Sequence, residues 1–187
     1  MKQGCVYLVG AGCGKADLIT VRGLELLRRC DALIYDDLID PALLDAAPPH
    51  AQQIYMGKRS GKHSASQEQI CAELRRQAAL GRTVVRLKGG DPFLFGRGGE
   101  ELELLRENGI PYEVVPGVTS SIAVPAYNGV PVTHRDFCSS VHIITGHKRA
   151  GEEYDIDFRA LVDTKGTLVF LMGVSALPDI CEGLIGA

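Results

Sequence analysis

The sequence predicts an α/β protein built on a parallel sheet. Short apolar or β-branched segments alternate with stretches of helical periodicity along much of the chain, an order typical of strands joined by crossover helices. Glycine-rich turns follow several of these segments, as expected where parallel strands end. The chain has 187 residues, of which 45% are apolar, so it is long enough to bury a core.

Five short segments are expected to form strands in the first part of the chain. Each is apolar or β-branched, and helical patterns separate most of them. They are residues 5–9 (CVYLV), 32–35 (ALIY), 53–55 (QIY), 84–87 (VVRL) and 112–115 (YEVV). Two further strands are expected at residues 141–145 (VHIIT) and 167–172 (TLVFLM).

Two helices have clear sequence boundaries. Ser66 and Gln69 have the spacing of a capping box, and the helix that begins there is expected to end at Gly81. A second helix is expected over residues 99–108, with Gly109 as its stop.

A stretch rich in proline and glycine, residues 116–135, interrupts the alternation of strands and helices. We therefore expect two α/β domains, residues 1–116 and 117–187. The second has few predicted elements, and the last residues, 180–187 (ICEGLIGA), resemble the interior of a helix. We expect this second domain to be incomplete.

Composition excludes several classes of protein. No apolar run approaches the length of a membrane span, and the apolar start is too short for a signal peptide, so a cytoplasmic protein is expected. The net charge of -3 argues against non-specific nucleic-acid binding. The six cysteines are widely spaced, which predicts neither a zinc site nor a disulfide framework, and we expect them to be buried. They are Cys5, Cys13, Cys30, Cys71, Cys138 and Cys181.

Basic residues gather in the predicted loops. If the fold brings them together, they form a cleft that attracts anions; if not, each group is a solvated loop. The groups are Lys58, Arg59, Lys62 and His63; Arg86, Lys88 and Arg97; His134 and Arg135; and His147, Lys148 and Arg149.

The first glycine loop, residues 10–14, has the spacing G-x-G-x-G. The dinucleotide fingerprint needs its third glycine where Lys15 stands, and a Walker P-loop fails because Ala16 follows Lys15. Two interpretations stay open. The small residues either allow a ligand or another loop to approach the backbone, or they form a plain tight turn.

A second glycine loop carries more chemistry. Gly89 and Gly90 follow a predicted strand, and Asp91 precedes Pro92, which keeps Asp91 extended. Other predicted strands end at Asp36 with Asp37 and, in the segment MGK, at Lys58. If these strand ends face one cavity, it suits a polar cofactor and an acidic substrate. Taken alone, Asp36 is more typical of a helix N-cap or a solvated loop than of a catalytic residue.

Three segments closely resemble the signature segments of the tetrapyrrole methylase family, and within it those of the uroporphyrinogen-III C-methyltransferases. The second and third segments are long and specific, and the resemblance runs from Val6 to about Gly173. The segments are residues 6–23 (VYLVGAGCGKADLITVRG), 86–101 (RLKGGDPFLFGRGGEE) and 116–135 (PGVTSSIAVPAYNGVPVTHR).

The resemblance implies a function. Such enzymes use S-adenosylmethionine to methylate C2 and C7 of uroporphyrinogen III, giving precorrin-2 for sirohaem and cobalamin. It also implies two α/β domains with the cofactor between them, and a homodimer. Because the sulfonium methyl group is already activated, no metal is expected. Methylation leaves the ring cationic, and a positioned carboxylate can assist the loss of a proton that follows.

The resemblance also assigns roles to residues. It implies that Asp36 is the proton acceptor and Lys58 the proton donor. The implied cofactor contacts are Cys13, Gly89, Gly90, Asp91, Leu94, Thr119, Ser120 and Met172.

The substrate carries eight carboxylates, which basic side chains are expected to bind. We expect that at least one of these side chains, Arg86 in particular, serves a structural ion pair instead. Tyr35 and Tyr127 are candidates to pack on a pyrrole face, although aromatic residues beside strand ends are more often core. The candidates for the carboxylates are Arg22, His63, Arg86, Arg97, His134 and Arg135.

Two positions of the first loop depart from the family pattern G-A-G-P-G-D. Cys13 replaces proline and Lys15 replaces aspartate; we expect Lys15 to point to solvent. Two alternatives remain beside uroporphyrinogen-III methylation. One is a methylase of the same fold acting on a later precorrin or a macromolecule, and the other is an inactive fragment.

Overall fold

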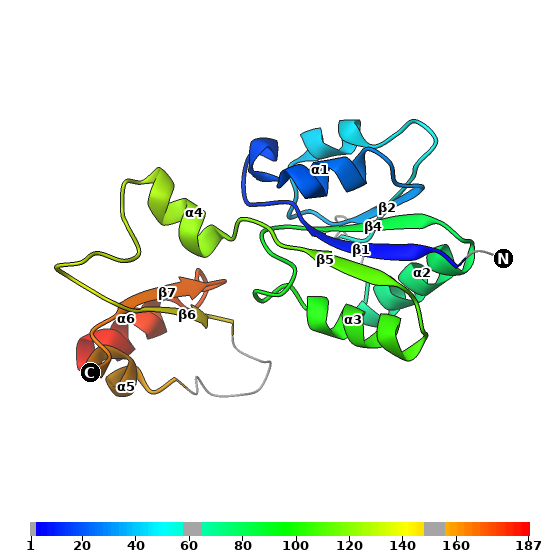
Figure 1. The fold of residues 1–187 in the computed structure, drawn as a ribbon. Helices are drawn as coiled ribbons and strands as arrows, with labels where there is room; N and C mark the ends of the chain where they lie inside the picture. Colours follow the sequence, from blue (N-terminus) through cyan, green and yellow to red (C-terminus); the bar gives the residue numbers. More distant parts are fainter. Residues whose placement is uncertain (1–2, 58–64, 148–155) are drawn as a thin grey trace. The chain divides into compact units, whose positions relative to one another are not determined.

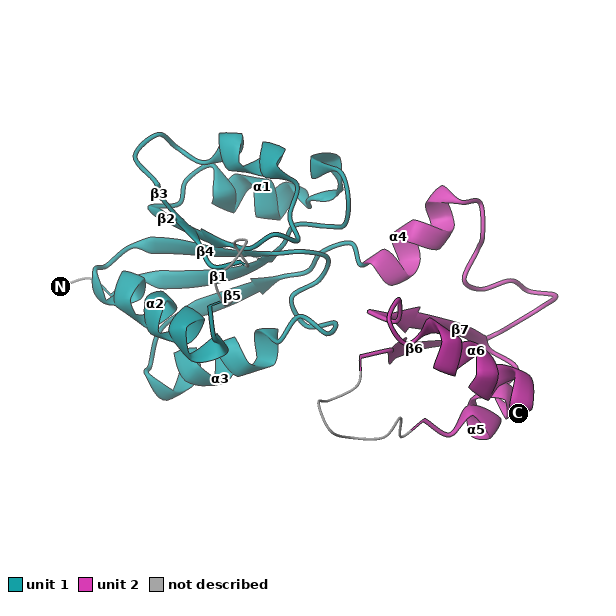
Figure 2. Cartoon of the chain, turned by 180° about the vertical axis from the view of Figure 1, so that it is seen from behind, with its two compact units in different colours: residues 1–119 teal, residues 120–187 magenta. Residues whose placement is uncertain are grey.

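The computed structural model describes residues 3–57, 65–147 and 156–187. The chain divides into two compact units, residues 1–119 and 120–187 (Figures 1 and 2). This division falls close to the boundary expected at residue 116.

Among the described residues of the first unit, five strands form a single sheet in the order β3-β2-β4-β1-β5, and all neighbouring strands are parallel. The predicted α/β fold with a parallel sheet is therefore confirmed. The strands are β1 (Cys5–Gly10), β2 (Ala32–Tyr35), β3 (Gln52–Tyr55), β4 (Thr83–Lys88) and β5 (Tyr112–Val115).

The register of the sheet aligns the ends of its central strands. β1 pairs with β4 from Cys5 opposite Thr83 to Gly10 opposite Lys88. Because the strands are parallel and end level, the loops that follow them leave from the same edge. Asp36 and Asp37, which follow β2, and Asp91, which follows β4, lie at this edge.

Helices cover both faces of the sheet (Figure 1), and an apolar cluster lies on each face. Successive residues of β1 alternate between them: Val9 packs with α1, whereas Val6 and Leu8 pack with α2 and α3. Both faces are thus buried, as is usual for parallel sheets. The covering elements are η1 (Ala16–Leu18), α1 (Val21–Leu27), η2 (Pro41–Ala46), α2 (Gln67–Ala79) and α3 (Gly98–Glu107).

The predicted helix boundaries are confirmed. The hydroxyl of Ser66 accepts a hydrogen bond from the amide of Gln69, and the Gln69 side chain accepts one from the Ser66 amide. After α2, Gly81 adopts a left-handed φ of 76°, the conformation that commonly ends a helix. Gly109 does the same after α3, with φ 62°.

The second unit contains a two-stranded parallel sheet, which confirms the two strands expected there. Every residue of both strands is only partly buried, and a two-stranded sheet has little stability of its own. The elements are α4 (Ser120–Tyr127), β6 (Val141–Thr145), α5 (Phe158–Asp163), β7 (Thr167–Leu171) and α6 (Leu177–Gly186).

Three features differ from the expectations or refine them. Helix α4 was not predicted, because the proline at 125 lies inside it and proline normally disfavours a helix interior. The expectation of buried cysteines is confirmed for Cys30 and Cys71 and wrong for Cys181, which is exposed, whereas the other three cysteines are only partly buried. Asp157, for which no role was predicted, accepts the amide of Ala160 as the N-cap of α5.

No helix within the described ranges combines the length and the apolar character that crossing a bilayer requires.

Replacing Ser66 by alanine should destabilise the first unit, because the amide of Gln69 loses its capping acceptor. We expect a loss of about 1 kcal/mol in the free energy of unfolding, measured by urea denaturation. Ser139→Ala is the matched control, because Ser139 is exposed in a loop. Equal stability of the two variants would contradict the capping role.

Candidate functional site

The loops after β1 and β4 are joined by backbone hydrogen bonds. The amide of Gly90 donates to the carbonyl of Gly12 over 2.7 Å, and the amide of Gly12 donates to the carbonyl of Gly90 over 3.3 Å. The amide of Ala11 also donates to the carbonyl of Lys88, over 2.8 Å. The two glycine loops therefore extend the pairing of their strands beyond the sheet.

A third loop, which follows β5, packs against this junction. A Cβ atom added to Gly10 would lie 2.5 Å from the amide nitrogen of Gly117 and 2.7 Å from the carbonyl oxygen of Gly90. No side chain fits there, so glycine is required for the close approach of another loop. The first loop was expected either to allow the close approach of a ligand or another loop, or to be a plain tight turn. At Gly10 the first interpretation holds, because another loop approaches its backbone.

The backbone of Gly90 is different, because one side of it is open. Gly90 has φ 65°, and among the described residues a Cβ added there would have only the Cα atom of Thr119 within 4 Å, at 3.9 Å. A ligand could therefore approach the backbone on this side without displacing a side chain. The geometry suits a cofactor held by main-chain groups of the glycine loop.

The carboxylate of Asp91 holds two of these loops together. Its Oδ1 accepts the amides of Phe93 (2.8 Å) and Leu94 (3.2 Å), and its Oδ2 accepts the amide of Gly117 (3.0 Å). These bonds turn the chain after Pro92 and fasten the third loop to the second. The Asp91 side chain therefore shapes the loops, and a direct contact with a cofactor stays a prediction.

Asp36 lies at the end of β2, and both of its carboxylate oxygens have a fixed donor. Oδ1 accepts the amide of Leu38 at 3.1 Å, and Oδ2 accepts Nη2 of Arg86 at 3.0 Å. The side chain is 22% exposed. Asp36 is not a helix N-cap; that role belongs to Asp40, whose carboxylate accepts the amide of Ala42 at the start of η2.

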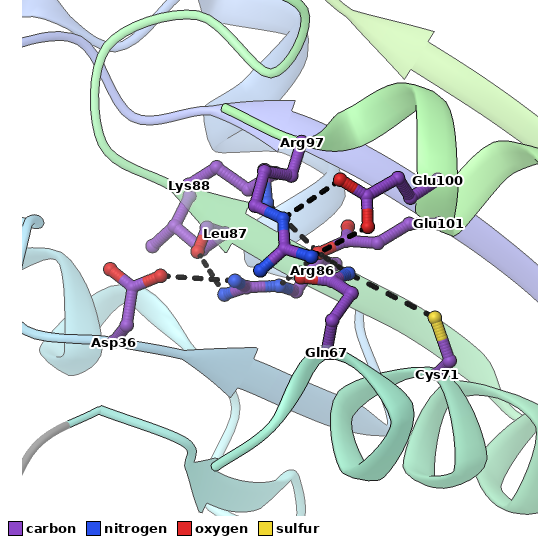
Figure 3. Close-up of polar contacts among 9 residues, drawn as sticks. All are labelled: Asp36, Gln67, Cys71, Arg86, Leu87, Lys88, Arg97, Glu100 and Glu101. Atoms are coloured by element: carbon purple, nitrogen blue, oxygen red, sulfur yellow. Dashed lines mark hydrogen bonds and ion pairs between the residues drawn. The ribbon is translucent and has the colours of Figure 1, made fainter. Parts of the chain in front are cut away.

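Beneath Asp36 lies a buried cluster of charges (Figure 3). Oε1 of Glu101 accepts Nζ of Lys88 at 2.9 Å and Nε of Arg86 at 3.3 Å, and the Gln67 amide donates to the same oxygen over 3.3 Å. The side chains of Arg86, Lys88 and Glu101 are 3%, 6% and 0% exposed. In the part of the chain that the structure describes, Oε2 of Glu101 has no hydrogen-bond partner.

Burial affects the ionisation of this cluster. Desolvation lowers the pKa of Lys88 below the ordinary lysine value, the Arg86 guanidinium lowers it further, and Glu101 opposes the shift. A lysine pKa that falls on folding means that protonation favours the unfolded chain. Lys88 therefore lowers the free energy of unfolding at pH values below its pKa in the folded protein. This effect disappears as the pH rises above the pKa of Lys88 in the unfolded chain.

Asp36, Arg86 and Lys88 line one pocket of about 530 Å³ at the carboxyl ends of β2 and β4. Its charged lining combines acids and bases, as expected for a site that takes a polar ligand. A second hollow of about 500 Å³ lies between α2 and α3, away from the strand ends, and shares Arg97 with the first. The charged residues of the first pocket are Asp36, Asp37, Arg86, Lys88 and Arg97.

The loop that borders this pocket holds strained backbone. Phe95 and Arg97 have φ values of 53° and 57°, a region that residues other than glycine seldom occupy. Met172, which follows β7 in the second unit, has φ 56° and a side chain that is largely exposed. Lys165, which was not a candidate, has a similar φ of 54°, so the roles proposed for Arg97 and Met172 stay predictions.

The predicted substrate ligands fall into different environments. Arg86 is buried between Asp36 and Glu101, so the expectation that it serves an ion pair is confirmed, and its guanidinium is not free to bind a substrate carboxylate. Arg97 is exposed and paired with Glu100, and this pairing lowers the pKa of Glu100. An exposed pair of this kind is weak, so a carboxylate ligand could replace Glu100.

The remaining basic candidates lie elsewhere. Arg22 pairs with Glu113 on β5, at the edge of the sheet opposite β3, so the structure does not bring it to the pocket. In the second unit, the rings of His134 and Phe137 form a tilted contact, with their centroids 4.8 Å apart. Arg135 is exposed there. Lys58 and His63 lie outside the described residues.

The other predicted residues are placed as follows. Gly89, Gly90, Asp91 and Thr119 lie in the joined loops, with Cys13 beside them and Leu94 in the turn that follows Asp91. Lys15 is exposed, as expected, and Ser120 begins α4. Tyr35 contacts Tyr55 edge to face, whereas Tyr127 is exposed.

Sequence reasoning missed Glu101 as a functional candidate and treated Lys88 only as one member of a basic loop. The sequence did contain a signal for a buried charged cluster. Arg86 and Lys88 lie two residues apart, and therefore on the same face, in an otherwise apolar buried strand. Buried charges require partners, and α3 supplies the acid. Among the described residues, no three His, Cys, Asp or Glu side chains gather to hold a metal.

Comparison with known proteins gives consistent matches. The family model of the tetrapyrrole (corrin/porphyrin) methylases matches residues 5–187. The porphyrin biosynthesis protein HemD of Ruminiclostridium josui is 54% identical over the whole chain, which spans 37% of that protein. The sirohaem synthase of Pseudomonas fluorescens SBW25 is 50% identical over 97% of the chain, which spans 39% of that protein.

Solved structures of methyltransferases also resemble the chain. The uroporphyrin III C-methyltransferase of Thermus thermophilus is 40% identical, with a TM-score of 0.79 over 97% of this chain and 76% of that one. A structure of the enzyme from the same organism with S-adenosylhomocysteine gives 39% identity and a TM-score of 0.79, over 97% and 71%. A cobalt-precorrin-4 methyltransferase gives a TM-score of 0.85 at 29% identity, over 98% and 74%.

Replacing Gly10 by alanine should destabilise the first unit, because the added methyl group would meet the backbone of Gly117 and Gly90. Overpacking of this kind costs about 1–3 kcal/mol. Gly99→Ala is the matched control: its added methyl group meets open space in the first turn of α3, and it should stabilise by up to about 1 kcal/mol. Urea unfolding measures both, and a Gly10→Ala variant as stable as wild type would contradict the close approach.

Proposed function

The chain belongs to the tetrapyrrole methylase family, and from that premise we propose that it methylates uroporphyrinogen III, with S-adenosylmethionine as the methyl donor. We further propose that methylation occurs at C2 and C7 and gives precorrin-2. The likeness to the Thermus thermophilus enzyme, at 40% identity, supports this choice of substrate.

The observation that carries the proposal is the position of Asp36. Its carboxylate is partly exposed at a pocket formed by strand ends, and it is held in place by Leu38 and Arg86. When bound, S-adenosylmethionine supplies a methyl group on a cationic sulfur, which a pyrrole carbon can accept by in-line displacement. The methylated ring is then cationic, and we assign Asp36 to accept the proton that leaves the adjacent bridging carbon.

The glycine loops fit the proposed cofactor. The open backbone at Gly90 leaves room for a ligand beside Thr119, and Gly89 and Leu94 belong to the same loop. We propose that these residues, with Cys13 and Asp91, hold the cofactor, and that Ser120 and Met172 of the second unit contribute to the same function. Most of the rate would come from orientation of the two reactants.

Basic side chains supply the expected recognition of the substrate. Uroporphyrinogen III is a polycarboxylate, and arginine binds carboxylates through two parallel hydrogen bonds. Among the described candidates, Arg97 lies at the pocket with an exposed side chain, and His134 and Arg135 remain candidates in the second unit. Lys58 and His63 are proposed from the family resemblance, with Lys58 as proton donor.

We also propose that the protein acts in the cytoplasm as a homodimer, in sirohaem or cobalamin synthesis. The sirohaem synthases among its relatives support the first of these pathways.

A second candidate is methylation of a later corrin precursor. It is favoured by the TM-score of 0.85 to the cobalt-precorrin-4 methyltransferase. The lower sequence identity of 29%, against 40% for the uroporphyrin III enzyme, places it second. Turnover of the two substrates, compared side by side under the same conditions, distinguishes these candidates.

The test is to supply uroporphyrinogen III and S-adenosylmethionine to the complete product of the gene, without oxygen. We expect a product that has gained two methyl groups by mass spectrometry, with formation of S-adenosylhomocysteine. Unchanged substrate with a folded protein that binds S-adenosylhomocysteine by calorimetry would contradict the substrate assignment alone.

Asp36→Asn should lower kcat by about 10²-fold or more, because the amide cannot accept the proton. Asp45→Asn is the control, because Asp45 is exposed in η2, away from the joined loops. Steady-state kinetics measures both. If Asp36→Asn retained the wild-type kcat, Asp36 would not be the proton acceptor.

A further inference from the structure

The buried charges on β4 have no evident purpose in the packing of the sheet. Val84, Arg86 and Lys88 point to the same face of the strand, and Val84 packs in the apolar cluster under α2 and α3. An apolar residue in place of Arg86 would continue that cluster. A buried ion pair is weak evidence for stability, since hydrophobic replacements are often as stable. The arrangement therefore needs another explanation.

Every contact of Arg86 restrains its guanidinium. Nε donates to Oε1 of Glu101 over 3.3 Å, Nη1 donates to the carbonyl of Leu87 over 3.0 Å, and Nη2 donates to Oδ2 of Asp36 over 3.0 Å. These acceptors come from α3, from β4 itself and from the end of β2. The planar guanidinium cannot rotate without losing at least one of them.

Glu101 fixes Arg86 from the side away from the pocket. Its side chain is fully buried, and its Oε1 also accepts Lys88 and Gln67. The two cations and the acids Asp36 and Glu101 together carry no net formal charge, so the cluster can be buried as a unit. Asp36 is its member nearest to solvent.

We propose that Arg86, held in place by Glu101, is a positioning residue that sets the orientation of the Asp36 carboxylate in the pocket. The inference rests on the proposed function, in which Asp36 accepts a proton. With Oδ1 fixed by Leu38 and Oδ2 fixed by Arg86, the carboxylate has one orientation. The lone pairs left free by these two bonds are then available to the substrate.

The test is a double-mutant cycle on kcat, measured on the complete product of the gene. Arg86→Lys keeps the charge but cannot reach three acceptors in a plane. We expect it to lower kcat by about 10²-fold, with the KM for each substrate and the affinity for S-adenosylhomocysteine changed by no more than about twofold. In the Asp36→Asn background, the same change should cost less than about twofold.

Arg76→Lys is the matched control, because Arg76 also donates to carboxylate oxygens through Nε and Nη2, but only to Glu73, on the surface of α2. Its kinetics should equal those of wild type. Circular dichroism shows whether each variant folds. If Arg86→Lys does not fold, the cycle is run with Glu101→Gln, which preserves the shape of the side chain. If neither variant folds, the cluster is structural and the proposal is wrong.

The other outcomes of the double-mutant cycle also test the inference. An equal loss in both backgrounds means that Arg86 does not act through Asp36, and a raised KM with unchanged kcat means that Arg86 binds substrate; either overturns the inference while the proposed function stands. A wild-type protein without activity on uroporphyrinogen III refutes the proposed function, and the inference with it.

Discussion

The close approach of three loops at Gly10, Gly90 and Gly117 is the constraint on which the candidate site depends. The backbones meet at distances that leave no volume for a Cβ atom at Gly10. Hydrogen bonds between Gly12 and Gly90 and the carboxylate of Asp91 then fix the loops to one another. Parallel strands that end level provide the common starting edge. The part of the site formed by the joined glycine loops thus consists mainly of main-chain atoms.

The charged cluster beneath the pocket connects this edge to the helices that cover the sheet. Glu101 on α3 contacts Arg86 and Lys88 on β4, and Arg86 contacts Asp36 at the end of β2. Three elements therefore determine where one carboxylate lies, and the contact between Arg86 and Asp36 joins residues 50 positions apart in the sequence. Because the cluster is buried, the surrounding dielectric is low and a displaced charge would lack a partner. This strongly favours a single arrangement.

The two units differ in how completely their strands are buried. In the first unit, the central strands are covered on both faces, whereas every residue of β6 and β7 is partly exposed. The chain spans less than two fifths of the two curated relatives described above. The hydrogen bonds described for Asp36, Arg86 and Asp91 are all made within the first unit.

The sequence by itself determined the parallel α/β fold, the limits of α2 and the family, because these depend on local periodicity, capping residues and long motifs. It also located Asp36 and the glycine loops, since strand ends can be recognised from the turn residues that follow them. Only the tertiary structure decided that Gly10 accommodates another loop, that Asp91 binds amides of two loops, and that Arg86 is bound by Asp36 and Glu101. These contacts join residues distant in the chain, and side-chain spacing along one strand or helix does not specify a partner on another.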